Sequence, residues 1–369
     1  MNISDSVLKK EEQVTLSLCE LYSAYGYAHY KMSKFEEYDL YVRNKSFLLS
    51  DRVITFTDTN GRLLALKPDV TLSIVKNSED GQGTPRKLYY NESVYRISES
   101  THAWREISQT GLECLGDIDE YRLSEVLLLA GKSLSLISPD YVLDVSHLGL
   151  LSLAMARAGV AEADEAVLLN CISQKNLHDA RTLLRERGLL DAAAPLLTLC
   201  ALAGKREDVL PVLLSLYGDE EWMREVKRLE YILAPLPTDS LRIDFSVIHD
   251  LSYYNGIVFQ GFIMGVPERV LSGGQYDKLM QKLGKTSGAV GFAVYPERLD
   301  VLGTQKDYDV DALLLYGEDT DICVLSRTVE MLVAAGERVT AQKSVPEKLR
   351  YKKLLSLTEG GVILLEENA

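Results

Sequence analysis

The residues of this chain best suited to chemistry are polar and aromatic side chains that could bind a small zwitterion. An amino acid with a nitrogen-containing ring needs a carboxylate for its ammonium group, polar partners for the ring, aromatic walls and a closely approaching backbone. These residue types alone leave a plainer interpretation open, because an alternating polar face is typical of a solvated strand and a Tyr-Tyr pair of a half-buried one. The candidates are Asp69, Gln109, Glu113, Tyr253, Tyr254 and the pair Gly273–Gly274.

Composition restricts the classes of function. The chain has 369 residues, 46% of them hydrophobic, which predicts a folded protein of two or three domains. Its formal net charge of −14 argues against a general nucleic-acid binder, because such proteins neutralise phosphates with Lys and Arg. Arg86–Lys87 and residues 350–353 are modest basic clusters of a kind that more often lies on a solvated surface. The composition still allows a local basic groove as an alternative.

Cysteine spacing and hydropathy indicate neither a metal site nor a membrane segment. The cysteines are far apart and include no Cys-x-x-Cys pair, which predicts buried, reduced thiols. No segment holds about 18 apolar residues without a charge, and the first residues lack the apolar core of a signal peptide. We therefore expect a cytoplasmic protein with no metal, no cofactor and no membrane contact. The five cysteines are Cys19, Cys114, Cys171, Cys200 and Cys323.

The elements that must position the candidate residues are mainly strands. Residues 7–27 predict an amphipathic helix, and residues 52–68 predict a hairpin turning at Thr-Asn-Gly. Residues 86–98 and 107–118 predict the next two strands of an antiparallel sheet. A helix is expected from Tyr121 to Ser135.

The second half of the chain predicts an insertion and a separate small domain. Residues 158–236 are rich in Leu and Ala and predict an all-helical insertion. Strand character returns at 240–265, where Asn255–Gly256 indicates a tight turn between apolar runs. From 306 to 369 the pattern predicts a small α/β domain, in the order strand 310–317, helix 320–335, strand 338–342, helix 346–357 and strand 360–367. The fold class expected is therefore α+β, with a first domain over 1–305.

Four segments, in order, resemble class II aminoacyl-tRNA synthetases, and specifically the histidyl-tRNA synthetases and their paralogue in histidine biosynthesis. Their order and spacing match over roughly residues 10–300, although any one alone would be weak. The resemblance implies an antiparallel sheet flanked by helices and a C-terminal domain like a shortened anticodon-binding domain. The segments are LALKPDVTLSIVKN (64–77), YNESVYRISESTHAWREISQTGLECLGDID (90–119), HDLSYYNGIVFQGF (249–262) and LSGGQYDKLMQKLGKTSGAVGFAVYPERL (271–299).

The resemblance also implies roles for individual residues. Asp69 and Thr71 would hold the ammonium group of histidine, and Gln109 and Glu113 would contact the ligand. The pair Tyr253–Tyr254 would wall its imidazole. Three arginines would be possible contacts for an anionic ligand: Arg96, Arg105 and Arg298.

The chain departs from the synthetases at positions that serve ATP. His249 stands where the synthetases have an arginine that stabilises charge on the α-phosphate, and a largely neutral imidazole cannot clamp a phosphate as guanidinium does. Tyr295–Pro296 replaces small residues before Glu297–Arg298 and should crowd the adenine site, and Gln275 replaces another arginine. The string YVLDVSHLGLL (141–151) is more similar to the paralogue, although His147 taken alone is more typical of a hydrogen-bonded buried histidine.

The resemblance therefore implies a regulatory subunit of ATP phosphoribosyltransferase, the first enzyme of histidine biosynthesis, rather than an enzyme. It would activate a short catalytic subunit, mediate feedback inhibition by histidine and form a dimer within a hetero-oligomer, with no catalytic residue, no aminoacylation and no tRNA partner. Two alternatives stay open. One is an active histidyl-tRNA synthetase with divergent motifs, and the other is a stand-alone histidine-binding protein.

Overall fold

The computed structural model describes residues 8–43, 53–78, 85–97, 102–248, 253–302 and 308–368. The chain divides into two compact units, Met1–Leu302 and Gly303–Ala369. No helix among the described residues is both long and apolar enough to cross a membrane.

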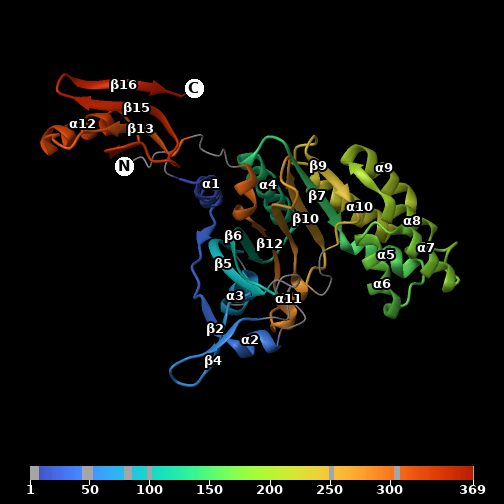
Figure 1. The fold of residues 1–369 in the computed structure, drawn as a ribbon. Helices are drawn as coiled ribbons and strands as arrows, with labels where there is room; N and C mark the ends of the chain where they lie inside the picture. The colour runs from blue at the N-terminus through green and yellow to red at the C-terminus, as the bar shows by residue number, and fades with distance from the viewer. Residues whose placement is uncertain are drawn as a thin grey trace. The chain divides into compact units, whose positions relative to one another are not determined.

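A nine-stranded sheet organises the first unit (Figure 1). Its strand order is β1-β5-β6-β12-β11-β10-β7-β9-β8, and the run from β5 to β7 is antiparallel throughout. Parallel pairs occur only towards the ends, between β1 and β5 and between β7 and β9. The predicted α+β class is thus confirmed. The strands are β1 (Ala28–His29), β5 (Arg86–Ile97), β6 (Trp104–Gly116), β7 (Tyr141–His147), β8 (Ala203–Lys205), β9 (Leu241–Asp244), β10 (Ile257–Ile263), β11 (Leu271–Gln275) and β12 (Gly288–Val294).

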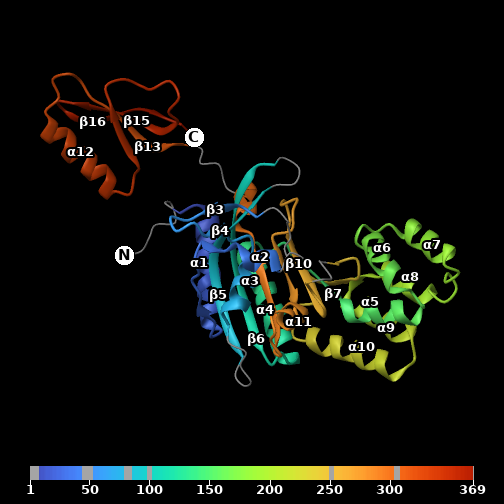
Figure 2. The ribbon, with the colours of Figure 1, turned by 90° about the horizontal axis from the view of Figure 1, so that it is seen from below.

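Alternation along β6 divides the core between the two faces of the sheet. Leu112 and Cys114 pack with α1 and α4, whereas Leu115 packs with α3 and α11 on the other face. A strand that is buried on both faces is expected to be almost entirely apolar, so polar residues within β6 are unusual. Figure 2 shows α1 and α3 on either side of β5. The helices are α1 (Lys10–Ala24), α3 (Val70–Asn77), α4 (Glu120–Ile137) and α11 (Asp277–Lys282), with a 3-10 helix, η2, at Pro296–Leu302.

The predicted hairpin precedes the site segment and is confirmed. Its turn is held by Asp58, whose carboxylate accepts from the backbone of Asn60 and Arg62, both at 2.8 Å, and Gly61 adopts a φ of 77°. The hairpin belongs to a three-stranded sheet of order β2-β4-β3, and α2 packs against it. These elements are β2 (Phe35–Glu37), α2 (Tyr38–Arg43), β3 (Thr55–Thr57) and β4 (Leu63–Leu66).

The insertion is helical except at one point. Helices α6 to α9 gather beside the end of the sheet formed by β7, β9 and β8, and α10 packs against α4 (Figures 1 and 2). The expectation of an all-helical insertion is wrong at Ala203–Lys205, which forms β8 because the edge of β9 offers it backbone partners. The helices here are α5 (Leu148–Arg157), α6 (Glu162–Ser173), α7 (Leu177–Glu186), α8 (Ala194–Ala201), α9 (Arg206–Leu216) and α10 (Glu220–Leu233).

Strand order and burial add two local details. The strands on either side of Asn255–Gly256, β9 and β10, are not paired with each other, because β7 lies between them. The Asn255 side chain instead bonds Asp277, accepting from its backbone at 2.8 Å and donating to its carboxylate at 3.1 Å. Of the five thiols expected to be buried, only Cys114 and Cys200 are, and Cys323 is exposed.

The second unit is a four-stranded sheet, β14-β13-β15-β16, with α12 packed on one face. The helix expected at 346–357 is wrong, since Tyr351–Thr358 forms β15. This Lys- and Leu-rich segment has ordinary helix propensity, but it pairs in parallel with β13 and antiparallel with β16, and pairing in a sheet overrides local propensity. The elements are β13 (Val310–Leu315), α12 (Ile322–Ala334), β14 (Val339–Gln342), β15 (Tyr351–Thr358) and β16 (Gly361–Glu367).

Candidate functional site

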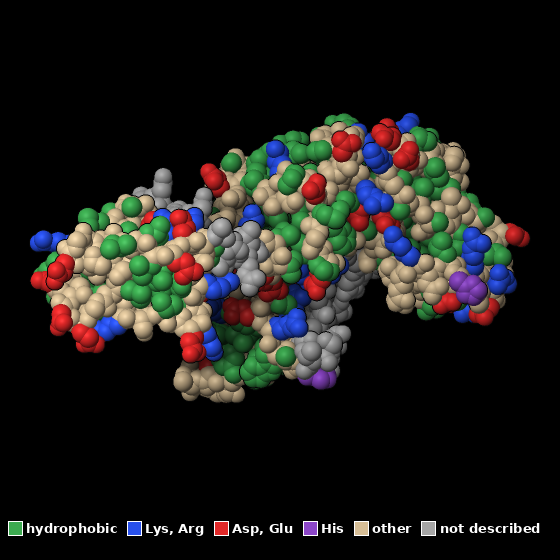
Figure 3. All heavy atoms as spheres, turned by 45° about the horizontal axis from the view of Figure 1, so that its top comes forward, with side chains coloured by type: hydrophobic (Ala, Val, Ile, Leu, Met, Phe, Trp, Pro, Cys, Tyr) green, Lys and Arg blue, Asp and Glu red, His purple; other side chains and the backbone are tan. Residues whose placement is uncertain are grey.

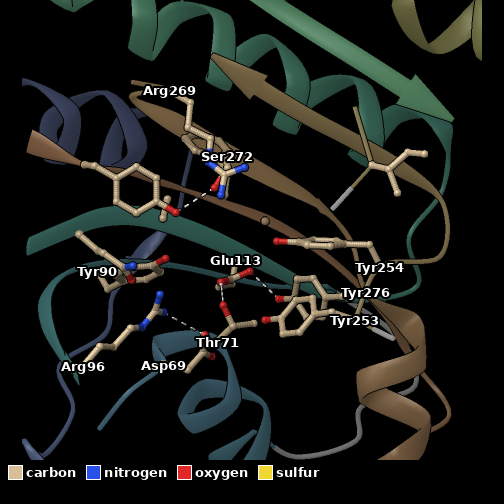
Figure 4. A pocket seen from close by; sticks show the side chains of 16 residues that line it. Asp69, Thr71, Tyr90, Arg96, Glu113, Tyr253, Tyr254, Arg269, Ser272 and Tyr276 are labelled. Atoms are coloured by element: carbon tan, nitrogen blue, oxygen red, sulfur yellow. Dashed lines mark hydrogen bonds and ion pairs between the residues drawn. The ribbon is translucent and has the colours of Figure 1, made fainter. Parts of the chain in front are cut away.

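A cavity of about 270 Å³ brings together all six residues expected to contact the ligand (Figure 4). Arg96 also lines it, whereas Arg105 is exposed on β6 and neither Arg105 nor Arg298 is among the lining residues. The volume suits a metabolite of amino-acid size better than a dinucleotide. The six are Asp69, Thr71, Gln109, Glu113, Tyr253 and Tyr254.

Strand register places the polar floor of the cavity. Gln109, Gly111 and Glu113 alternate along β6, and Gly111 lies opposite Tyr90 of β5. Gln109 is 5% exposed and Glu113 is 2% exposed, so the solvated-strand interpretation of this face is wrong. Tyr90 was not singled out from the sequence, although its place in the alternation of β5 could have indicated it.

Glu113 is the most perturbed acid of the cavity. The hydroxyl of Thr71 donates to its Oε1 at 2.6 Å, and the hydroxyl of Tyr276 donates to its Oε2 at 2.5 Å. Burial raises the pKa of Glu113 to about 8, although both hydrogen bonds act in the opposite direction. The side chain is therefore mostly protonated at pH 7 and can both donate and accept a hydrogen bond.

Gly291 of β12 leaves the space that Glu113 occupies. The two residues are register partners, and a Cβ at position 291 would lie 1.7 Å from Glu113 Oε2 and 2.5 Å from the carbonyl oxygen of Leu112. The carboxylate could move, but the backbone carbonyl could not do so without breaking the ladder. Only glycine fits here.

Gly291→Ala should therefore lower the free energy of unfolding by about 3 kcal/mol, a typical cost of overpacking a core. Chemical denaturation of the full chain measures it. Gly218→Ala is the matched control, because no atom lies within 4 Å of the added Cβ, and it should leave stability unchanged. Equal stability of the two variants would contradict the close approach of β12 to Glu113.

Asp69 has both a structural and an accessible oxygen. Its Oδ1 caps α3 by accepting from the backbone N–H of Leu72 at 2.8 Å, and its Oδ2 lies 3.9 Å from Arg96 Nη2. Arg96 also donates from Nε to the carbonyl of Pro68 at 2.8 Å, which fixes the start of the helix. Burial raises the pKa of Asp69 and the charge of Arg96 opposes this shift. A cationic ligand group would favour the ionised carboxylate.

Tyrosine rings form one wall of the cavity. The ring centroids of Tyr253 and Tyr254 are 4.7 Å apart, and those of Tyr253 and Tyr276 are 5.7 Å apart. Figure 4 shows the three rings side by side, facing Glu113 and Thr71. The departure at His249 lies outside the described residues.

The side of the cavity towards η2 is occupied by Tyr295. Its hydroxyl hydrogen-bonds the hydroxyl of Ser272 at 2.8 Å, and the guanidinium of Arg298 lies 4.4 Å from its ring centroid. Arg298 Nε is 3.1 Å from a Glu268 carboxylate oxygen. The other departure, Gln275, donates to Asp277 at 2.6 Å, next to the Asn255 contact.

Other residues that line the cavity were not singled out from the sequence. Arg269 and Ser272 reach the cavity from the connection between β10 and β11 and from β11 itself.

His147 lies outside the cavity as a buried cap of α5, its Nδ1 accepting from the backbone N–H of Leu150 at 3.1 Å. Burial lowers the pKa of His147 to about 4. No group of His, Cys, Asp or Glu suited to a metal ion occurs among the residues that the structure describes.

Comparison with known proteins places this fold in a family. A family model described as histidyl-tRNA synthetase matches residues 3–299. The ATP phosphoribosyltransferase regulatory subunit of Caldanaerobacter subterraneus subsp. tengcongensis is 30% identical over 302 residues, covering 76% of this chain and 75% of that protein. The histidine–tRNA ligase of Methanocaldococcus jannaschii is 26% identical over 353 residues, covering 94% of this chain and 84% of that protein.

The fold has a solved counterpart. A structure described as an ATP phosphoribosyltransferase regulatory subunit/histidyl-tRNA synthetase from Bacillus halodurans aligns with a TM-score of 0.73 at 23% identity, covering 90% of this chain and 88% of that one. The class II synthetase-like fold expected from the sequence is thus confirmed. The chain belongs to the histidyl-tRNA synthetase family, in the group that also contains the ATP phosphoribosyltransferase regulatory subunits.

Proposed function

We propose that this chain is a histidine-binding regulatory subunit of ATP phosphoribosyltransferase and has no aminoacylation activity. The observation that carries the proposal is a cavity with the residue types for histidine, next to a tyrosine where a synthetase needs room for ATP. The names of relatives such as the Caldanaerobacter protein support the role. The partner would be the catalytic subunit of that enzyme.

Each part of histidine has a suitable partner in the cavity. The ammonium group would bind Asp69 and Thr71, and the imidazole would lie against Tyr253 and Tyr254. Neutral imidazole carries one donor and one acceptor. A protonated Glu113 can serve either nitrogen, and the amide of Gln109 can serve the other. The binding site thus needs no fixed charge at the ring.

Adenylation would fail because the space for ATP is obstructed, and because arginines that stabilise its phosphate in a synthetase are replaced or engaged elsewhere here. Activation of an amino acid builds negative charge on the α-phosphate, which guanidinium groups stabilise in a synthetase. Here His249 replaces one arginine, and Arg298 packs on Tyr295 beside Glu268. Tyr295 itself bonds Ser272 at the edge of the cavity, where its ring would obstruct adenine.

The C-terminal unit and the surface charge add to the argument against tRNA. The unit has one helix and four strands among its described residues, and we propose that it is a reduced relative of the anticodon-binding domain. On the face in Figure 3, Lys and Arg are interspersed with Asp and Glu instead of gathering in one area. With a net charge of −14, RNA binding would have little electrostatic support.

Two assays on the purified full chain test the proposal. Histidine-dependent exchange of pyrophosphate into ATP should be absent, with a histidyl-tRNA synthetase as the positive control. Added to the catalytic subunit from the same source, the chain should form a complex, raise its activity and make it sensitive to histidine. A coupling free energy of about 1–3 kcal/mol would change histidine affinity about 5- to 150-fold between the two states of the complex.

The outcomes separate the alternatives. The Methanocaldococcus relative, which aligns over most of this chain, keeps the synthetase open as the second candidate. Robust exchange would establish the synthetase and overturn the regulatory role. Absence of both exchange and complex at micromolar concentrations, with histidine still bound, would leave a stand-alone histidine-binding protein.

A further inference from the structure

Arg269 enters the cavity from the side opposite Asp69. It lies between β10 and β11, and Figure 4 shows its guanidinium directed inwards beside Ser272. Asp69 and Thr71 come from the start of α3 across the cavity, with Glu113 between the two sides. The cavity therefore has the Asp69 carboxyl group, with Arg96 3.9 Å from it, on one side and the Arg269 guanidinium on the other.

The backbone around Arg269 is fixed by the sheet. The next residue, Val270, is fully buried and donates its N–H to the carbonyl of Gly261 at 2.8 Å. The carbonyl of Val270 accepts from Tyr295 at 2.9 Å, and the carbonyl of Arg269 accepts from the guanidinium of Arg298. These contacts to both neighbouring strands fix the backbone at Arg269, although Arg269 itself is exposed at the mouth of the cavity.

The charge of Arg269 acts inside the cavity. Burial raises the pKa of Tyr254 well above its ordinary value, and the positive charge of Arg269 is the contribution that opposes the neighbouring acids and tyrosines. The other arginine lining the cavity, Arg96, holds Pro68 and Asp69. An amino acid is a zwitterion, so its carboxylate needs a cation as much as its ammonium needs an acid.

We propose that Arg269 binds the free α-carboxylate of the amino acid and so makes the site select a free acid over a derivative that lacks that group. This proposal rests on the proposed histidine site and deepens it. Guanidinium suits the role because it presents two parallel donors to a carboxylate. A reaction intermediate whose carboxyl group is already joined to phosphate would not offer that partner.

Calorimetric titration of the full chain with histidine and with histamine, which lacks the carboxylate, tests the proposal. R269Q should weaken histidine binding about tenfold to a hundredfold, as expected for the loss of a hydrogen bond to a charged group, and leave histamine binding unchanged. R269K keeps a charge but not the fork of donors, so its histidine affinity should fall between those of the parent and R269Q. R86Q, at an exposed arginine of β5 away from the cavity, is the matched control and should bind both ligands as the parent does.

The possible results are distinct. Histidine affinity unchanged in R269Q, or equal losses for histidine and histamine, would overturn the role of Arg269 while the histidine site survives. If histamine binds the parent too weakly to measure, R269K decides, and affinity equal to that of R269Q counts against the proposal. A parent chain that binds no histidine would refute the proposed ligand itself, and the role of Arg269 with it.

Discussion

Glu113→Gln should remove most of the loss of stability that the parent suffers between about pH 5 and pH 8. In the unfolded chain Glu113 ionises around its ordinary value of 4.5, whereas burial holds the pKa in the folded chain at about 8. Between these values the folded state keeps a proton that the unfolded state has released, so the parent loses stability as pH rises. At 1.36 kcal/mol per pKa unit, the full loss is about 5 kcal/mol.

Denaturation midpoints of parent and variant across this pH range measure the effect. Gln keeps the shape of the side chain, and the hydroxyls of Thr71 and Tyr276 can rotate to serve an amide. The stability of the variant should therefore rise relative to that of the parent as pH increases, and should exceed it at pH 8. Glu230→Gln, at an exposed position of α10, is the control and should run parallel to the parent. Parallel curves for Glu113→Gln as well would mean that Glu113 is not held neutral by burial.

Asp69→Asn should abolish most histidine binding while leaving the fold intact. Asn caps helices as well as Asp does, so the bond to Leu72 can persist. The ammonium group of the ligand would lose its buried counter-charge, and breaking such a pair costs about 2–5 kcal/mol. We expect the dissociation constant for histidine to rise by about 100-fold or more, as measured by calorimetric titration.

Asp119→Asn is the matched control for this variant. Asp119 caps α4 with the same geometry, accepting from the backbone of Arg122 at 2.9 Å, but it does not line the cavity. Both variants should have melting temperatures close to that of the parent, and only Asp69→Asn should lose histidine binding. Undiminished binding by Asp69→Asn would move the ammonium site elsewhere, and parallel losses in both variants would indicate an effect on folding.

Local sequence patterns predicted most strands of the central sheet and several residues that line the cavity. The Asn60–Gly61 turn and the alternation in β5 and β6 are properties of adjacent residues, so they can be read without knowledge of distant contacts. The resemblance to the synthetases added the positions of Asp69, Thr71 and the tyrosine pair, which the structure brings to one cavity. That histidine is the ligand stays a prediction.

Errors arose where distant contacts decide between similar local preferences. Tyr351–Thr358 carries Lys and Leu, which favour a helix, yet it lies between β13 and β16 and forms a strand. Ala203–Lys205 forms β8 only because the edge of β9 is within reach. Asn255–Gly256 lies between two apolar runs as expected, but the sheet places β7 between β9 and β10, so these two strands do not pair.

The sequence by itself determined which residue types the site could use, because period-two alternation and motif spacing fix the direction of side chains along a strand. Only the tertiary structure decided what those groups are chemically. Tyr276 reaches Glu113 from 163 positions away in sequence, and Gly291 opens the space for its carboxyl group. Burial in the folded chain keeps a proton on this group at neutral pH, although its hydrogen bonds to Thr71 and Tyr276 favour ionisation. Likewise, Arg269 faces the cavity because the pairing of β10, β11 and β12 anchors its segment at that mouth, and desolvation and strand pairing are properties of the folded chain alone.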